Sequence, residues 1–437
     1  MRVPPPRLTV LLCLLVLSGC SYIPWLAGEK DPRPPTELGP VPNEVGLTTL
    51  WSISTGKGTD GRRLSLVPAY QNGQLFVADA RGLVTAVSAA EGRVLWQKDT
   101  RLALSGGPAV DGNRLVVGST NGDLLALNTA DGGELWRTQV GSEILSVPRF
   151  ANDKVVVHTL NDSVFGLDAA KGELLWNYDF QAPVLTLRGS STPVIVGDHA
   201  IVGVSGGRLA KIELASGLPE WITTVTPPRG RSELERIADL NATPVVAGET
   251  LYVTAYNGDL AALDLNSGAV LWRRALSSYA GLTLADGTLY VTDANDVVWA
   301  AKPEDGAGLW KQEALRYRIL SAPAVEGNTV LVGDLEGYVH LLARSDGHPQ
   351  GRARLAKGAI QAQPLVVAGR IYVLGADGTL VALTLGTAQA LSSASPSPTP
   401  SPSSASASSS SSPSPTLAAP SAPPSSALTP AAAPPAV

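Results

Sequence analysis

Cysteine is almost absent from this sequence, and its placement excludes several kinds of chemistry. Both cysteines, Cys13 and Cys20, lie within the first twenty of 437 residues. The rest of the chain therefore has no thiol for a disulfide, a thiolate metal site or a cysteine nucleophile.

Charge is scarce as well. Charged residues make up 16% of the chain, below the roughly 25% of an average globular protein. The net charge of −5 comes without a long basic run, so no nucleic-acid partner is expected. The four histidines are scattered without metal-ligand spacing, which predicts no metal site. They are His158, His199, His340 and His348.

The first twenty residues have the layout of an export signal. Two arginines precede an apolar run over residues 8–17, which is too short to span a bilayer as a mature helix. The ending LSGC resembles the bacterial lipobox. This resemblance implies a signal peptide over residues 1–19 and a lipid anchor, with acyl chains such as palmitate, on Cys20. Ser21 follows the pattern for sorting to the outer membrane, where the chain would face the periplasm. The alternative is an ordinary signal peptide with an incidental cysteine.

Two further segments are expected to lie outside the fold. Residues 20–45 are rich in proline and show no clear period, which predicts a lipidated leash. Residues 386–437 are almost entirely Ser, Pro, Ala and Thr, which predicts a disordered tail that cannot bury enough apolar area to fold. A wall-spanning spacer, a glycosylated stalk and neutral drift all stay open as roles for this tail.

A phrase of about forty residues recurs between these ends, with a glycine four residues before a tryptophan. The tryptophans are Trp96, Trp136, Trp176, Trp221, Trp272 and Trp310, and the glycines are Gly92, Gly132, Gly172, Gly217, Gly268 and Gly306. A seventh copy keeps Gly347 but has Gly351 in place of the tryptophan. This period is typical of a propeller or a solenoid.

Each copy contains short β-like runs joined by tight hairpin pairs such as Asn257-Gly258. An eighth copy begins at Gln363 and stops near Leu385 without its last strand, which we find instead around Trp51. The pattern predicts an all-β, eight-bladed propeller of four-stranded blades over residues 46–385. Its N-terminal strand completes the last blade and closes the ring. The repeated tryptophans are expected to be apolar wedges between blades.

Two short motifs are excluded by their context. Residues 56–61 spell G-x-G-x-x-G, but the helix that would hold a pyrophosphate does not follow. Residues 203–207 spell G-x-S-x-G, but they fall in a hairpin rather than in a strand-to-helix turn. We therefore predict no catalytic residue and no enzymatic activity.

Deviations from the forty-residue period locate a candidate surface. The two largest internal excesses are consecutive and hold residues 183–193 and 226–244, so their loops should emerge side by side on one face. These loops combine apolar side chains with arginines and carboxylates, the ingredients of a protein-binding hot spot. The residues in question are Leu185, Leu187, Arg188, Arg229, Arg231, Glu233, Glu235, Arg236 and Asp239. The alternative is that both leucines turn into the core and Arg188 caps a loop.

The repeat AxDGxxLW resembles that of the quinoprotein dehydrogenases, propellers that bind pyrroloquinoline quinone and calcium. The larger enzymes of that family use an adjacent cysteine pair, which this chain lacks beyond residue 20. The resemblance therefore supports the fold and argues against the chemistry, and no cofactor is predicted.

Over residues 20–385 the chain resembles the BamB family, the lipoprotein propellers of the outer-membrane β-barrel assembly machinery (BAM complex). The resemblance rests on the lipobox, the eight blades and the segments LTLRG and RIADLNATPVV. It implies a scaffold that binds the periplasmic POTRA domains of BamA and assists insertion of barrel proteins. Unfolded outer-membrane proteins are a further candidate partner. The implied contacts are Leu185, Leu187, Arg188, Asp239 and Asn241, with Asn241 in place of a second acidic residue. From the long loop itself, and not from the resemblance, we expect a second set of possible contacts: Arg229, Arg231, Glu233, Glu235 and Arg236. A quinone-dependent dehydrogenase and a cell-wall or sugar-binding propeller stay open as alternatives.

Overall fold

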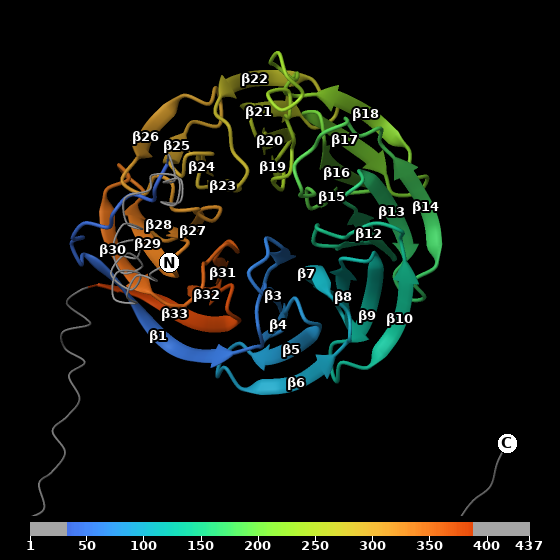
Figure 1. Cartoon of the computed structure of the whole chain (residues 1–437), viewed down its shortest axis with the longest axis horizontal. Coiled ribbons are helices and arrows are strands. Elements are labelled where there is room, and N and C mark those ends of the chain that lie inside the picture. Colours follow the sequence, from blue (N-terminus) through green and yellow to red (C-terminus); the bar gives the residue numbers. More distant parts are fainter. Residues whose placement is uncertain (1–32, 388–437) are drawn as a thin grey trace, which may run out of the picture. The chain divides into compact units, whose positions relative to one another are not determined.

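The computed structural model describes residues 33–387, which form eight β-sheets around a central axis (Figure 1). The predicted eight-bladed propeller is confirmed, and the described residues contain no helix. None of them forms a helix that is long and apolar enough to cross a membrane. The predicted signal peptide, Cys20 and residues 388–437 lie outside the described residues.

The strands form where short apolar runs alternate with tight turns. In blade 5, Thr250–Thr254 and Asp259–Asp264 are almost entirely buried because each face of the sheet packs on a neighbouring blade. Asn257, in the hairpin between them, has a φ of 51°, a conformation that asparagine tolerates better than most residues. Sheets covered on both faces thus explain why the strands are apolar throughout rather than alternating.

The strands are numbered in chain order, and each blade uses consecutive strands from the axis outward, except blade 8. Blade 1 comprises β3 (Ala69–Gln71), β4 (Gln74–Ala78), β5 (Leu83–Ser88) and β6 (Val94–Asp99), and blade 2 comprises β7 (Leu104–Asp111), β8 (Arg114–Ser119), β9 (Asp123–Asn128) and β10 (Glu134–Gln139). Blade 3 comprises β11 (Arg149–Ala151), β12 (Lys154–His158), β13 (Ser163–Asp168) and β14 (Leu174–Asp179), and blade 4 comprises β15 (Val194–Val196), β16 (His199–Val204), β17 (Arg208–Glu213) and β18 (Pro219–Thr224). Blade 5 comprises β19 (Val245–Ala247), β20 (Thr250–Thr254), β21 (Asp259–Asp264) and β22 (Val270–Ala275), and blade 6 comprises β23 (Gly281–Ala285), β24 (Thr288–Thr292), β25 (Val298–Ala301) and β26 (Gly308–Gln312). Blade 7 comprises β27 (Ala324–Glu326), β28 (Thr329–Gly333), β29 (Tyr338–Ala343) and β30 (Pro349–Arg354), and blade 8 comprises β31 (Leu365–Val367), β32 (Arg370–Leu374), β33 (Thr379–Thr387) and β1 (Val45–Ser54). A short extra strand, β2 (Ser65–Leu66), pairs in parallel with β7 on the inner side of blade 2.

The ring closes as predicted. Strand β1 pairs antiparallel with β33, in a register that runs from Val45 opposite Thr387 to Ser54 opposite Thr379. Figure 1 shows the blue β1 lying along the outer side of the red-orange β33. The two ends of the folded region therefore share one sheet, and the eighth blade cannot form without both.

The repeated tryptophans join each blade to the next one. Trp136 of blade 2 donates its indole N–H to the carbonyl oxygen of Ala169 in blade 3 at 3.0 Å. Its ring lies where a side chain on Gly172 would stand, and Gly172 has a φ of +73°. The other junctions of this kind pair Trp51 with Gly92, Trp96 with Gly132, Trp176 with Gly217, Trp221 with Gly268, Trp272 with Gly306 and Trp310 with Gly347. The predicted wedge is confirmed, and the glycine that receives it belongs to the following blade.

The hydrophobic core is divided among the junctions between blades. Each of eight buried clusters combines residues of two adjacent sheets; one, for example, packs Ile201 and Leu209 of blade 4 against Leu251 and Val253 of blade 5. Every blade thus depends on both neighbours for burial of its apolar surface.

Residues 34–44, which we call the strap, lie against blade 7 and its junction with blade 6. The Thr36 amide donates to the Arg316 carbonyl at 3.1 Å, and Leu38 packs into the core between these blades. Further along, the Glu44 amide donates to the Gln350 carbonyl at 2.9 Å. The part of the predicted leash that the structure describes is therefore docked on the ring.

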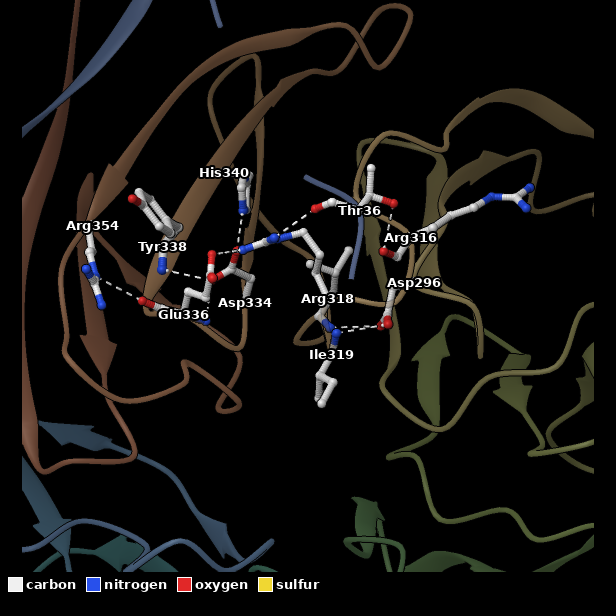
Figure 2. A network of polar contacts seen from close by, with 11 residues as sticks. Thr36, Asp296, Arg316, Arg318, Ile319, Asp334, Glu336, Tyr338, His340 and Arg354 are labelled. Carbon is white, nitrogen blue, oxygen red and sulfur yellow. Dashed lines mark hydrogen bonds and ion pairs between the residues drawn. The ribbon is translucent and has the colours of Figure 1, made fainter. Parts of the chain in front are cut away.

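A buried charged network holds the strap (Figure 2). The Arg318 guanidinium donates to the Thr36 carbonyl at 2.9 Å and pairs with the Asp334 and Glu336 carboxylates. His340 contacts the same Asp334 oxygen at 2.9 Å. Burial alone would raise the pKa of Asp334, but its hydrogen bonds with His340, the Tyr338 amide and Arg318 together lower it. Asp334 is thus a compensated buried charge.

Candidate functional site

All connections from the outer strand of one blade to the inner strand of the next lie on one side of the ring. The hairpins between the second and third strands of each blade lie on the same side, because strand direction alternates within a sheet. We call this side the loop face. Residues 180–193, between β14 and β15, and residues 225–244, between β18 and β19, are two consecutive connections on it.

Asp239, in the second of these connections, bonds the first connection and a neighbouring hairpin. This carboxylate accepts the Leu187 amide at 2.6 Å and the Gly206 amide of the β16–β17 hairpin at 3.0 Å. Its side chain is almost fully buried. Burial raises the pKa of Asp239, and the two amide hydrogen bonds oppose that shift. The structure therefore gives Asp239 the geometry of a tie between the connections rather than of an exposed contact.

Tied in this way, the segment around Leu187 presents apolar side chains to solvent. Val184 and Leu185 are 90% and 44% exposed, and Leu187 is half-buried. Two exposed apolar side chains in succession do not fit a segment whose leucines both turn into the core. At the Leu187 end, a side chain on Gly189 would contact the Asn241 amide group at 3.0 Å. Asn241 therefore lies directly against the segment.

Arg188 is exposed and reaches two neighbouring connections. Its guanidinium donates to the Arg63 carbonyl at 3.0 Å and pairs with the Glu143 carboxylate at 2.5 Å. These partners come from the connections before blade 1 and before blade 3. Arg188 thus joins three connections of the loop face that are distant in sequence.

The second set of predicted residues occupies a protruding turn over blade 5. The Glu235 carboxylate accepts the Arg231 amide at 2.7 Å, and Arg229 lies 3.8 Å from the Asp259 carboxylate. Glu233 and Arg236 approach to 3.7 Å. All five side chains are exposed, and the neighbouring Leu234 is 72% exposed. This turn adds a mixed-charge border to the surface around Leu187.

Two hollows lie along the axis beside these residues. One, of about 390 Å³, is lined by Leu187, Arg188 and Asn241 together with Arg63 and Tyr279. The other, of about 960 Å³, is lined mainly by the inner strands and the connections that precede them, and it includes Asn241 as well. Leu187, Arg188 and Asn241 therefore border the mouth of the central channel.

Metal-ligating side chains do not cluster among the described residues. No group of three or more His, Cys, Asp or Glu side chains among residues 33–387 could hold a metal ion. His158 is buried and contacts the Ser191 carbonyl at 3.0 Å, and His340 belongs to the Arg318 network. The G-x-G-x-x-G residues lie in the irregular connection between β1 and β2, and the G-x-S-x-G residues form the β16–β17 hairpin.

This region also contains Arg63, Glu143 and Tyr279, which the sequence pattern did not indicate. The connections of Glu143 and Tyr279 are of ordinary length, whereas that of Arg63, residues 55–68, is as long as residues 180–193. This excess was missed because it lies before Trp96, the first tryptophan of the counted repeats. Its length and the basic pair Arg62-Arg63, directly after the glycine-rich run at 56–61, were the available signals.

Comparison with known proteins places these features in a family. The family described as "Outer membrane protein assembly factor BamB" matches residues 47–101, 80–312 and 303–422. A relative of that name from Pseudomonas aeruginosa is 47% identical over 376 residues, covering 86% of this chain and 98% of the relative. The Escherichia coli protein of the same name is 34% identical over 384 residues, covering 86% and 97%.

Solved structures agree on the architecture. BamB from Moraxella catarrhalis has a TM-score of 0.72 and 29% identity, and the match covers 78% of this chain and all of that one. A quinohemoprotein alcohol dehydrogenase from Comamonas testosteroni has a TM-score of 0.64, with 78% and 76% covered, but only 14% identity. The second similarity concerns the fold alone.

Proposed function

The chain belongs to the BamB family of outer membrane protein assembly factors, and on that premise we propose that its loop face docks BamA. The chain is a non-catalytic propeller subunit of the outer-membrane assembly machinery and not a dehydrogenase. The docking surface comprises Leu185, Leu187 and Arg188, with Asn241 beside them. Asp239 holds the segment in place from below.

The observation that carries this proposal is the bond between Asp239 and the Leu187 amide. An exposed apolar segment on a long loop would ordinarily lose conformational entropy on binding a partner. Here the buried carboxylate fixes the segment in advance, while Leu185 and Arg188 stay accessible. Preorganised apolar and arginine side chains of this kind are typical of binding hot spots.

The remaining parts of the chain complete the proposal. Residues 1–19 are the signal peptide, and Cys20 carries the lipid that anchors the chain at the outer membrane, facing the periplasm. Residues 20–45 link the lipid to the propeller at 46–385, and residues 386–437 form the tail. The described strands run from Val45 to Thr387, close to these limits.

Direct contact with unfolded barrel proteins is a further part of the proposal. The outer strand of each blade ends its sheet, and in blade 7 the strap bonds the Gln350 carbonyl on that edge. A β-bulge interrupts each outer strand just before the tryptophan position, as at Leu135 in β10. A substrate strand could pair only beyond the bulge, for instance along Arg137–Gln139. Photo-crosslinkers placed there should trap unfolded barrel proteins, and crosslinks to BamA alone would contradict direct contact.

Affinity copurification from detergent-solubilised membranes tests BamA docking. We expect BamA in the eluate of the unmodified protein and its loss with Arg188→Glu, because that change reverses the charge of the exposed guanidinium. Arg93→Glu is the matched control, since Arg93 is exposed in a turn on the opposite face. Thermal unfolding checks that each variant is folded. Retention of BamA by folded Arg188→Glu would contradict the proposed site.

A further inference from the structure

The mouth of the central channel contains a second group of residues suited to a partner protein. We propose that Arg63, Tyr279 and Ile319, opposite the Leu187 segment, receive a side chain or short loop of the docked protein that carries a carboxylate next to an apolar group. This inference rests on the proposed function. It extends the docking surface from one pair of connections to the full width of the mouth.

Arg63 supplies a positive charge that forms no ion pair with a carboxylate of the described residues. Its guanidinium lies 4.6 Å from the centre of the Tyr279 ring, and no ion pair involving it occurs within residues 33–387. Arg63 acts electrostatically on the Asp296 carboxylate, and Asp293 and Asp296 both act on Tyr279. Because neither carboxylate forms an ion pair with Arg63, charge complementarity at this guanidinium favours an acidic group of a partner.

Both of those carboxylates are already used within the chain. Asp293 accepts the Trp299 indole N–H at 2.9 Å and the amides of Asn295 and Val297. Asp296 accepts the amides of Ile319 and Leu320 at 2.9 and 2.8 Å. Neither is positioned by its hydrogen bonds to neutralise Arg63.

Ile319 supplies an apolar side chain in an unusual conformation. It is 39% exposed and has a φ of 53°, which is a genuine outlier for a β-branched residue. Asp296 fixes its amide on one side, and the preceding Arg318 is anchored to Asp334 on the other (Figure 2). Backbone strain held in this way by buried charges is typical of functional positions.

The hollow between these side chains is part of the same surface as the Leu187 segment. Leu187, Arg188, Arg63, Tyr279 and Ile319 all line the cavity of about 390 Å³. Arg188 also bonds the Arg63 carbonyl at 3.0 Å, so the two arginines are mechanically linked. A protein that touches Arg188 therefore lies directly above the cavity.

The wall of the cavity has an unused polar atom. Ser190 is 6% exposed, and its hydroxyl has no hydrogen-bond partner. Buried polar groups normally find a partner, so a polar group of an inserted segment could satisfy it. The Arg63 cation, the apolar Ile319 and the free Ser190 hydroxyl together fit a loop that carries a carboxylate better than a purely apolar loop.

Binding of the full-length lipoprotein in detergent to the purified periplasmic domains of BamA tests this inference. Arg63→Glu should weaken binding at least tenfold, Arg63→Lys should weaken it much less, and the effect of Arg63→Glu should shrink at high salt. The matched control is Arg101→Glu, an exposed arginine on another loop-face connection that does not line the cavity. The dissociation constant of this control variant should stay within twofold of that of the unmodified protein.

Ile319→Gly separates a binding role from a structural one. Glycine accepts this φ without strain, so thermal stability should not fall, while the loss of the apolar side chain should weaken binding at least threefold. Unchanged binding for folded Arg63→Glu and Ile319→Gly, with loss for Arg188→Glu, would overturn this inference and leave the proposed function standing. Failure of the unmodified protein to bind would overturn both.

Discussion

The carbonyl oxygen of Val45 occupies the space that a side chain on Gly351 would need. Gly351 stands where other copies of the repeat have a tryptophan. At those junctions the tryptophan rests on a turn of the next blade, but here the next blade begins its outer strand at Val45 and has no such turn. The seventh copy thus lacks its tryptophan at the junction where the N-terminal strand closes the ring.

Gly351→Ala should therefore destabilise the propeller by about 1–3 kcal/mol, the usual cost of overpacking a core. Chemical denaturation, followed by tryptophan fluorescence, measures this loss. Gly386→Ala, in strand β33 of the neighbouring closing sheet, is the control, because its added methyl group would meet Thr48 at an ordinary distance of 3.6 Å. Equal stability of the two variants would contradict this account of Gly351.

Trp136→Ala should reduce the free energy of unfolding by about 3–5 kcal/mol, since it opens a cavity between blades 2 and 3. Trp136→Phe keeps much of the ring but leaves the Ala169 carbonyl without its donor, which should cost about 1–3 kcal/mol. Urea denaturation ranks the variants. A phenylalanine variant as unstable as the alanine variant would show that the hydrogen bond, rather than the wedge, dominates.

Asp239→Asn should loosen the Leu187 segment, because the amide nitrogen of asparagine faces either the Leu187 or the Gly206 N–H. An unsatisfied donor at this buried position costs about 1–3 kcal/mol. Faster hydrogen exchange at Leu187 and weaker BamA binding should occur together. Glu249→Gln, an exposed change in the β19–β20 hairpin on the opposite side of the ring, should alter neither. Weaker binding without faster exchange would instead indicate direct contact by Asp239.

Arg318→Ala should destabilise the protein by about 3–5 kcal/mol, because it leaves the buried Asp334 charge under-compensated. It also removes a bond to the strap at Thr36, so limited proteolysis should cleave residues 33–44 faster. Arg316→Ala, two residues earlier and with an exposed ion pair, should leave the strap protected. Unchanged cleavage in Arg318→Ala would show that Leu38 packing alone holds the strap.

Stability should carry a pH dependence from His348, next to the closing strand. Hydrogen bonds with Glu44 and Asp346 raise the pKa of His348 above its ordinary value. A raised pKa in the folded state gives stability that is complete below about pH 6.5, the unfolded value, and is lost as the pH rises through the folded value. His348→Gln should remove this component.

The measurement is the difference in denaturation midpoint between the unmodified protein and His348→Gln at pH 5.5 and pH 8.5. The other histidines contribute to both proteins and cancel in the difference. We expect the larger difference at the lower pH, and it should be small because the pair is exposed. A larger difference at pH 8.5 would contradict the assignment.

The fold was predictable because its chemistry is periodic. A tryptophan every forty or so residues fixes the number of blades, and the displaced copy around Trp51 predicts closure without any knowledge of distant contacts. The long connections were predictable as well, because excess length is visible in a repeat. The burial of Asp239 beneath the Leu187 segment was not predictable, because it depends on the hairpin that brings Gly206 next to its carboxylate.

Contacts across the mouth of the channel cannot be predicted from the repeat pattern of the sequence. Arg63 and Arg188 are separated by 125 residues, and Arg63 meets Tyr279 from a different blade again. The strap was equally hidden, because Thr36 is held partly through its backbone carbonyl, which every sequence provides. Such contacts follow from the curvature of the ring and can be found only after it has closed.

The strap also decides how the ring would bear a mechanical load. A pull on the chain ahead of residue 33 reaches the contacts of Thr36 and Leu38 before it reaches Val45. Such a pull would therefore have to break contacts at the junction of blades 6 and 7 before it reached the seam between β1 and β33.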